Sequence, residues 1–195
     1  MRGLERERRP RFAHELQAEA DSLFNSAAWC NTHKAAHIMG AVSLTILNFP
    51  DSEFDKIGIL ILAKAVEAHI DLFKPSIIYT HFANDLSVDH RRTNEAVVVA
   101  CRPKPGHPVK ELFFFEVASS TEWQVPSTFQ PNLFISIDDA CAELKERALT
   151  EAYGGEMRGS NHPRSVDSIG MLGFWRGASC GHKQAEAFVV GRIIR

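Results

Sequence analysis

The chain has 195 residues, a formal net charge of −2, 45% hydrophobic residues and 24% charged residues. This length suits a single globular domain, and a charge near zero gives no global electrostatic case for binding nucleic acid. No apolar run approaches the ~20 residues that cross a membrane, and no secretory signal pattern is present. The four widely spaced cysteines form no Cys-x-x-Cys motif, which favours a reducing, cytoplasmic compartment.

The chain begins with a basic segment, residues 1–11, in which acids are interleaved. We expect this segment to be disordered and residues 12–195 to form one domain. Apolar spacings of three and four predict helices over residues 12–39, 57–73, 89–101, 138–153, 165–175 and 185–190. Short apolar runs between turn signals predict strands over residues 42–47, 77–80, 112–117 and 133–137.

This alternation predicts an α/β fold, a Rossmann-like three-layer sandwich with helices on both faces of a mostly parallel sheet. Doubly wound folds usually begin with a central strand whose carboxyl end carries chemistry. Here the chain opens with a predicted helix, so that first strand is missing from the pattern.

The most informative segment is the loop between a predicted strand and a predicted helix, Thr80 to Arg91. It contains His81, Asp85, Asp89 and His90, and ligands bind at this edge of open α/β sheets. Imidazole and carboxylate groups together are zinc ligands. The alternative is a helix cap with a solvated histidine, and spacing alone leaves both interpretations open.

Two later segments have the same ambiguity. The segment that follows the predicted strand over residues 112–117 carries two acids, three hydroxyls and an indole, from Glu116, residues 119–121, Glu122 and Trp123. These groups could bind a polyhydroxylated ligand, or they could form capping turns. His162-Pro163-Arg164-Ser165 is either a turn with an N-cap or a rim element reaching the same cleft. Residues 176–177 and 185–188 are interpreted as helix-end packing.

Taken in order, these segments resemble the PIG-L/LmbE-type deacetylases from about residue 12 to the C-terminus. The matching motifs are Phe49-Pro50-Asp51, Lys74-Pro75, Tyr79-Thr80-His81, Asp85-Leu86-Ser87-Val88-Asp89-His90-Arg91, Ala100-Cys101-Arg102-Pro103, Glu116-Val117-Ala118-Ser119-Ser120-Thr121-Glu122-Trp123, Phe129-Gln130-Pro131-Asn132, His162-Pro163-Arg164-Ser165 and Ala185-Glu186-Ala187-Phe188. The resemblance implies a Rossmann-like fold and zinc-dependent hydrolysis of N-acetyl groups on amino-sugar conjugates.

The resemblance also implies roles for individual residues. His90 matches a zinc-binding histidine, flanked by Asp89 and Arg91, and Asp51 matches a residue that contacts the sugar. Ser87 holds a place where some members have a histidine that assists the oxyanion, and His81 is a substitute for it. The catalytic candidates are therefore Asp89 and His81. The substrate-binding candidates are Asp51, Asp85, Arg91, Glu116, Ser120, Glu122, Trp123, His162 and Arg164.

The family signature Ala-His-Pro-Asp-Asp-Glu is absent, and with it the family's first strand-helix-strand unit, two metal ligands and the general base. The sequence could be an incomplete gene model, a genuine fragment or a degenerate relative. Two functions stay open: a zinc-dependent N-deacetylase, whose activity in this chain is in doubt, or a non-catalytic saccharide- or partner-binding remnant. A transferase is disfavoured because no Gly-x-Gly-x-x-Gly follows a strand. An exposed sheet edge would favour self-association.

Overall fold

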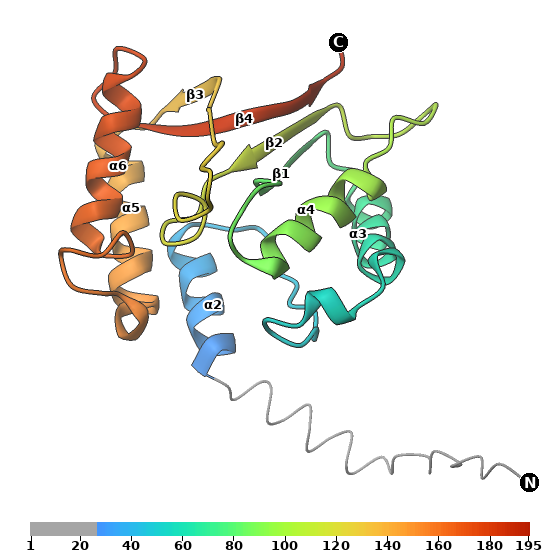
Figure 1. The fold of residues 1–195 in the computed structure, drawn as a ribbon, viewed down its shortest axis with the longest axis horizontal. Helices are drawn as coiled ribbons and strands as arrows, with labels where there is room; N and C mark the ends of the chain where they lie inside the picture. Colours follow the sequence, from blue (N-terminus) through green and yellow to red (C-terminus); the bar gives the residue numbers. More distant parts are fainter. Residues whose placement is uncertain (1–26) are drawn as a thin grey trace, which may run out of the picture.

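A four-stranded mixed sheet lies at the centre of the computed structural model, which describes residues 27–195 (Figure 1). Its strands are β1 (Ile77–His81), β2 (Glu111–Phe115), β3 (Leu133–Ser136) and β4 (Ala185–Ile193), in the spatial order β1-β2-β4-β3. Strands β1 and β2 pair in parallel, whereas β4 is antiparallel to both β2 and β3. The α/β class is confirmed, but the sheet is mixed, not mostly parallel.

The sheet differs from the prediction because the last element is a strand. Residues 185–190, predicted as a helix, begin the nine-residue strand β4. The run Ala-Glu-Ala-Phe-Val-Val fits a helical spacing, yet the β-branched residues Val189 and Val190 favour a strand once neighbours exist on both sides. Val190 pairs with Phe113 of β2, and Phe188 pairs with Leu133 of β3.

A second prediction also fails. Residues 42–47, predicted as a strand, have no regular secondary structure, and Val42 is fully exposed at 103%. An alternating apolar pattern gives a strand only where a neighbour offers hydrogen-bonding partners, and this segment pairs with no strand of residues 27–195.

Five α-helices surround the sheet in the described range: α2 (Ala27–Ile38), α3 (Ile59–Phe73), α4 (Val88–Ala100), α5 (Asp139–Arg147) and α6 (Val166–Ala178). Helices α3 to α6 match the predictions, with η2 (Ala148–Ala152), a π-helical turn, continuing α5. Of the first predicted helix, residues 27–38 are helical, and residues 12–26, like the basic segment 1–11, lie outside the described residues. Helices α3 and α4 gather beside β1, and α5 and α6 gather on the β3 and β4 side (Figure 1).

Side-chain caps fix where three of these helices begin. The hydroxyl of Ser87 accepts from the backbone N–H of His90, Asp138 accepts from Cys141 at 2.8 Å, and Ser165 accepts from Ser168 at 3.0 Å. Each cap satisfies a donor that the helix itself leaves free. Ser87, unlike Ser165, also lines a cavity at the start of α4.

The buried core lies where α3 and α4 meet the sheet. One cluster joins Ile70, Val97, Cys101, Val109 and Leu112, among others, and a second joins Leu62, Ala63 and Ala96 between α3 and α4. All four cysteines are free.

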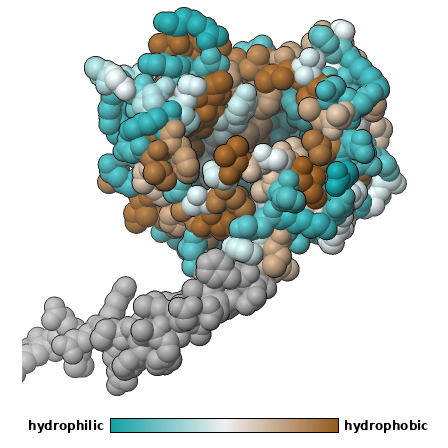
Figure 2. All heavy atoms as spheres, turned by 180° about the vertical axis from the view of Figure 1, so that it is seen from behind, coloured by the Kyte–Doolittle hydropathy of each residue, from teal (hydrophilic) through white to brown (hydrophobic). Residues whose placement is uncertain are grey.

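Many large hydrophobic side chains are nevertheless exposed. They include Leu60 at 62%, together with Ile61, Leu72, Phe73, Ile77 and Tyr79. Figure 2 shows hydrophobic groups at the surface of the face opposite to that of Figure 1. No helix of the described chain combines the length and hydrophobicity needed to cross a bilayer.

Candidate functional site

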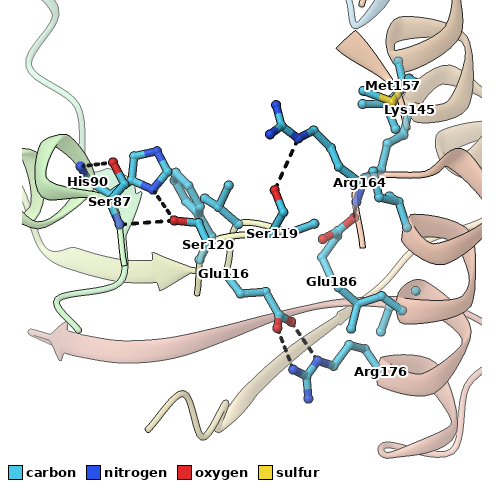
Figure 3. Close-up of a pocket in the computed structure, with 18 of the residues that line it drawn as sticks. Ser87, His90, Glu116, Ser119, Ser120, Lys145, Met157, Arg164, Arg176 and Glu186 are labelled. Carbon is cyan, nitrogen blue, oxygen red and sulfur yellow. Dashed lines mark hydrogen bonds and ion pairs between the residues drawn. The ribbon is translucent and has the colours of Figure 1, made fainter. Parts of the chain in front are cut away.

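A cavity of about 720 Å³ lies beyond the carboxyl end of β2, between the start of α4 and the inward face of α6 (Figure 3). We call it the inner cavity. Ser87, His90 and Ser120 lie on one side of it, and Arg164, Lys145 and Met157 lie on the other. Its volume is in the range of small-molecule sites, and its position is the edge at which open α/β sheets bind ligands.

His90 lines the inner cavity and is oriented by a carboxylate behind it. Its Nδ1 lies 2.9 Å from Oδ1 of Asp85, and its side chain is 24% exposed. Because a carboxylate only accepts, Nδ1 carries the proton and Nε2 is left with a free lone pair. Nε2 has no hydrogen-bond partner within residues 27–195. A carboxylate that fixes the tautomer in this way is the usual support of a ligating or acid–base histidine.

Asp85 is fully buried, so it lies behind His90 and not in the cavity wall. Ser120 Oγ donates to its Oδ1, Thr121 Oγ1 donates to its Oδ2 at 2.6 Å, and Ser87 N–H donates at 2.9 Å. Burial alone would raise the pKa of Asp85, but these hydrogen bonds outweigh it and hold the pKa below its usual value. Asp85 is therefore a charged anchor that joins the two sequence segments singled out above.

His81 stacks on the other side of His90, with ring centroids 4.2 Å apart, and it does not line the inner cavity. Its Nδ1 is buried and has no hydrogen-bond partner among the described residues. Burial, followed by the charge of a protonated His90, lowers the pKa of His81 to about 4, although Asp85 acts in the opposite direction. The structure thus places His81 as a neutral packing partner of His90.

Asp89 and Arg91 flank His90 in sequence but hold backbone. The Asp89 carboxylate accepts from Ser52 N–H at 2.7 Å and from Phe54 N–H at 3.0 Å, which docks the turn before η1 (Phe54–Lys56) onto α4. This contact brings exposed Asp51 to the wall of the inner cavity. Arg91 Nη1 donates to the carbonyl oxygens of Asp85 and Leu86, which fixes the loop shape.

The segment after β2 folds into a tight turn against the cavity. Ser119 has a positive φ of 64°, and Glu122 accepts from the backbone N–H groups of Ser119 and Ser120. Glu122 therefore stabilises the turn, while Ser120 faces both Asp85 and the inner cavity. Trp123 lies outside the inner cavity and meets the ring of His162 edge-on, with centroids 5.3 Å apart.

The far wall carries charged residues that the sequence interpretation partly missed. Arg164 was predicted, and its Nε donates to Ser119 Oγ at 3.3 Å. Arg176 and Glu186 were interpreted as helix-end packing, but both line the inner cavity, as does Lys145. The signal was present, since Ile169, Gly173 and Arg176 recur at helical spacing and share the inward face of α6.

Most of these charges neutralise one another. Arg176 donates to Glu116 through two hydrogen bonds of 2.8 and 2.7 Å, and Lys145 donates to Glu186 at 2.5 Å. Arg164 has no carboxylate partner within residues 27–195. The cavity thus offers hydroxyls, paired charges, one guanidinium and the carboxylate of Asp51, which suit a polar ligand of little net charge.

The site does not fit a zinc ion on the residues described. A catalytic zinc needs three protein ligands, and residues 27–195 contain no group of three His, Cys, Asp or Glu side chains placed to hold a metal. His90 could supply one ligand through Nε2.

The fold and the cavity define an α/β protein with a cavity of small-molecule size beyond the carboxyl end of β2. The family model for GlcNAc-PI de-N-acetylases, PIG-L, matches residues 16–101. This first part of the chain therefore resembles the PIG-L family, as its motifs indicated. No curated protein sequence matches the chain.

Two solved structures share the fold. The conserved protein TT1542 from Thermus thermophilus is 20% identical, with a TM-score of 0.66 over 85% of this chain and 73% of that one. The N,N'-diacetylchitobiose deacetylase from Pyrococcus horikoshii, complexed with its inhibitor MPG, is 16% identical, with a TM-score of 0.63 over 92% of this chain. This chain spans 65% of the length of the Pyrococcus protein.

Proposed function

We propose that the inner cavity is the substrate-binding site of a PIG-L-type N-deacetylase and binds an N-acylated amino-sugar conjugate, with its acyl amide beside His90. The observation that carries this proposal is the orientation of His90. Asp85 directs its free Nε2 away from the buried network, at one end of a cavity whose other walls carry sugar-binding groups.

The wall chemistry supports a sugar. Asp51 and the hydroxyls of Ser87 and Ser119 can exchange hydrogen bonds with ring hydroxyls, since carboxylates accept and hydroxyls do both. Arg164, without a carboxylate partner in the described chain, can donate to a carbonyl or to an anionic substituent. Leu172 and Met157 offer apolar surface to the C–H groups of the sugar ring.

Hydrolysis needs more than the described residues supply. Metal-assisted amide hydrolysis requires a complete ligand set and a general base that takes a proton from water. Among residues 27–195, Asp51 is the carboxylate of the inner cavity that lacks a cationic partner, and no group of metal-ligating side chains accompanies it. The alternative is a saccharide-binding member of the family without its own catalysis.

Titration calorimetry on the 195-residue chain tests the proposal. N-acetylglucosamine is expected to bind, and glucosamine, which lacks the acyl group, is expected to bind at least several-fold more weakly. The variant Arg164→Met should weaken binding about tenfold, because a charge-assisted hydrogen bond contributes about 1.5–3 kcal/mol. Gln130→Met, at an exposed loop position, is the matched control.

The same samples separate the two functions. Acetate release in the presence of Zn²⁺ would show that this chain completes a catalytic site, whereas saccharide binding that is unchanged by a chelator, without acetate release, would identify the binding-only member. Failure of every saccharide to bind would contradict both.

A further inference from the structure

Strand β1 stands at one end of the sheet and has a free edge within the described chain (Figure 1). It pairs with β2 along one side, and no strand of residues 27–195 pairs with its other side. Its five residues include no lysine, glutamate or proline, which natural proteins use to block such edges. Ile77 and Tyr79 are 43% and 45% exposed, so β1 can accept a further strand.

Residues 42–47, which we call the 42–47 segment, have the sequence of a strand and no strand to pair with in residues 27–195. All six residues are exposed, and none of them is charged, proline or glycine. Their backbone groups make no hydrogen bond to other backbone groups of the described range. Short neutral runs of this kind are the segments that add to free sheet edges.

The two faces of β1 differ in chemistry. Ile77 and Tyr79 lie on one face of the sheet, and Thr80 lies on the other, because side chains alternate along a strand. The ring of Tyr79 is 5.3 Å from that of Phe113 and 5.0 Å from that of Phe188, measured between centroids. These contacts form an aromatic row that ends at the free edge.

The 42–47 segment divides in the same way. Its apolar residues at alternate positions share one side of an extended chain, and its hydroxyl residues share the other. The first set is Val42, Leu44 and Ile46, and the second is Ser43 and Thr45. Beside β1, the first set would continue the aromatic row and the second would lie on the face of Thr80. Neither piece contains an acid, a lysine or an arginine, so their pairing desolvates no permanent charge.

We propose that two copies of this chain form a dimer in which the 42–47 segment of each copy adds to β1 of the other. The two segments lie next to each other at the two-fold axis and run antiparallel. Each segment thus pairs on both edges, with β1 of the partner copy and with the segment of the partner copy. The two sheets become one continuous sheet, and the symmetric interface leaves neither edge free.

The connections within one copy permit this arrangement. The segment is tied to its own copy through Ser52, whose N–H donates to Asp89 of α4 at 2.7 Å, and α4 contacts β1. In the dimer the segment lies two strands away from its own β1, which is about 10 Å. The five residues from position 47 to position 52 can span up to about 17 Å.

The exposed area suits a second copy as the occupant. The apolar residues of the 42–47 segment and of the β1 edge expose on the order of 600 Å² on each copy, and the polar residues and paired backbone raise this toward the about 800 Å² per partner of a stable interface. An unrelated peptide at β1 would leave the 42–47 segment exposed, including Val42 at 103%. Reciprocal exchange covers both pieces at once.

Sedimentation velocity and amide hydrogen exchange on the 195-residue chain test the proposal. The chain should change from monomer to dimer as its concentration rises. Exchange of the 42–47 segment and of the β1 amides that do not bond to β2 should slow together, by at least about tenfold, as the dimer forms.

Thr45→Pro is the specific variant, because proline cannot donate a hydrogen bond to a neighbouring strand. It should weaken the dimer at least about tenfold, since a lost hydrogen bond in each copy is worth this much in affinity. The denaturation midpoint of the dilute monomer should not change, because Thr45 is exposed and its backbone bonds to no backbone group of residues 27–195. Thr45→Val keeps the N–H and the branched side chain and should dimerise like the wild type.

Three results would overturn the proposal. The first is a monomer at every concentration, and the second is a dimer that Thr45→Pro does not weaken relative to Thr45→Val. The third is slower exchange in β1 without slower exchange in the 42–47 segment, which would show that two β1 strands pair directly. None of these results depends on saccharide binding, so this inference and the proposed function stand or fall separately.

Discussion

A single buried carboxylate determines what His90 can do. Asp85 receives Ser120, Thr121 and His90 at once, so it aligns the imidazole and ties the loop before α4 to the turn after β2. Because the hydrogen bonds hold the pKa of Asp85 below its usual value, the anchor stays charged at neutral pH. The orientation of His90 therefore depends on both the loop before α4 and the turn after β2.

His81 gives the site a pH dependence of stability. Its pKa is about 4 in the folded chain and near 6.5 when unfolded, so between these values the unfolded state binds a proton that the native state does not. The free energy of unfolding should then fall as pH drops from 6.5 to 4, by about 2 kcal/mol between pH 7 and pH 5. Urea denaturation at both pH values measures this change.

The control for this prediction is His81→Phe. Phenylalanine keeps the ring contact with Phe115 and removes both the titrating group and the buried Nδ1 without a partner in residues 27–195. Between pH 7 and pH 5, the free energy of unfolding of the variant should fall by about 2 kcal/mol less than that of the wild type. Asp85 does not affect this comparison, because a carboxyl group whose pKa is lowered in the folded state changes the free energy of unfolding only below about pH 4. Equal losses would show that His81 is not buried as described.

At the scale of elements, two glycines of α6 differ in the space that surrounds them. At Gly177 an added Cβ would lie 2.6 Å from the backbone N of Gln184, because the chain turns back closely into β4. At Gly170 nothing lies within 4 Å of an added Cβ.

We therefore expect Gly177→Ala to destabilise the chain by about 1–3 kcal/mol, the usual cost of overpacking. Gly170→Ala should stabilise it by about 0.5–1 kcal/mol, because alanine lowers the entropy cost of the helix. Chemical denaturation of both variants checks the pair. Similar effects for the two substitutions would contradict the close approach of α6 and β4.

Element types were predictable from the sequence wherever local signals agreed. Helix α6 begins after Ser165, the expected cap, and α4 begins within one residue of its predicted start. Strand β4 was missed because its partners β2 and β3 are distant in sequence, and local periodicity favoured a helix. Segment 42–47 failed for the converse reason, since its strand pattern has no partner strand in the described chain.

The candidate site shows the same limit. Loop residues such as His90 and Glu116 could be selected because their chemistry is unusual beside a predicted strand. Lys145 and Glu186 could not, because a charged residue on a helix or strand is usually solvated, and only the packing of α6 against β4 and of α5 against α6 turns these two inward.

At the scale of the molecule, the exposed hydrophobic surface on α3 is an association hazard. Leu60 and Ile61 on the first turn of α3 join Leu72, Phe73 and Ile77 among the exposed apolar side chains. Monomeric proteins rarely expose large apolar patches. The described fold therefore carries a surface that favours contact with other apolar groups.

Leu60→Glu should reduce concentration-dependent light scattering without loss of stability. The side chain is 62% exposed, and a glutamate in the first turn of a helix interacts favourably with its dipole, so the free energy of unfolding should change by less than about 1 kcal/mol. Gln130→Glu adds the same charge at an exposed loop position and should leave scattering nearly unchanged. Equal scattering of all three proteins would show that α3 does not provide a surface through which the chain associates.

The strand order β1-β2-β4-β3 has a consequence for synthesis on the ribosome. Strands β2 and β3 emerge first but have no contact in the sheet until β4 is inserted between them. The same late segment brings Ala185 and Glu186 to the inner cavity. A nascent chain that ends before residue 185 therefore exposes the bare edge of β2 and lacks part of the cavity wall, so the inner cavity is the last feature that the growing polypeptide completes.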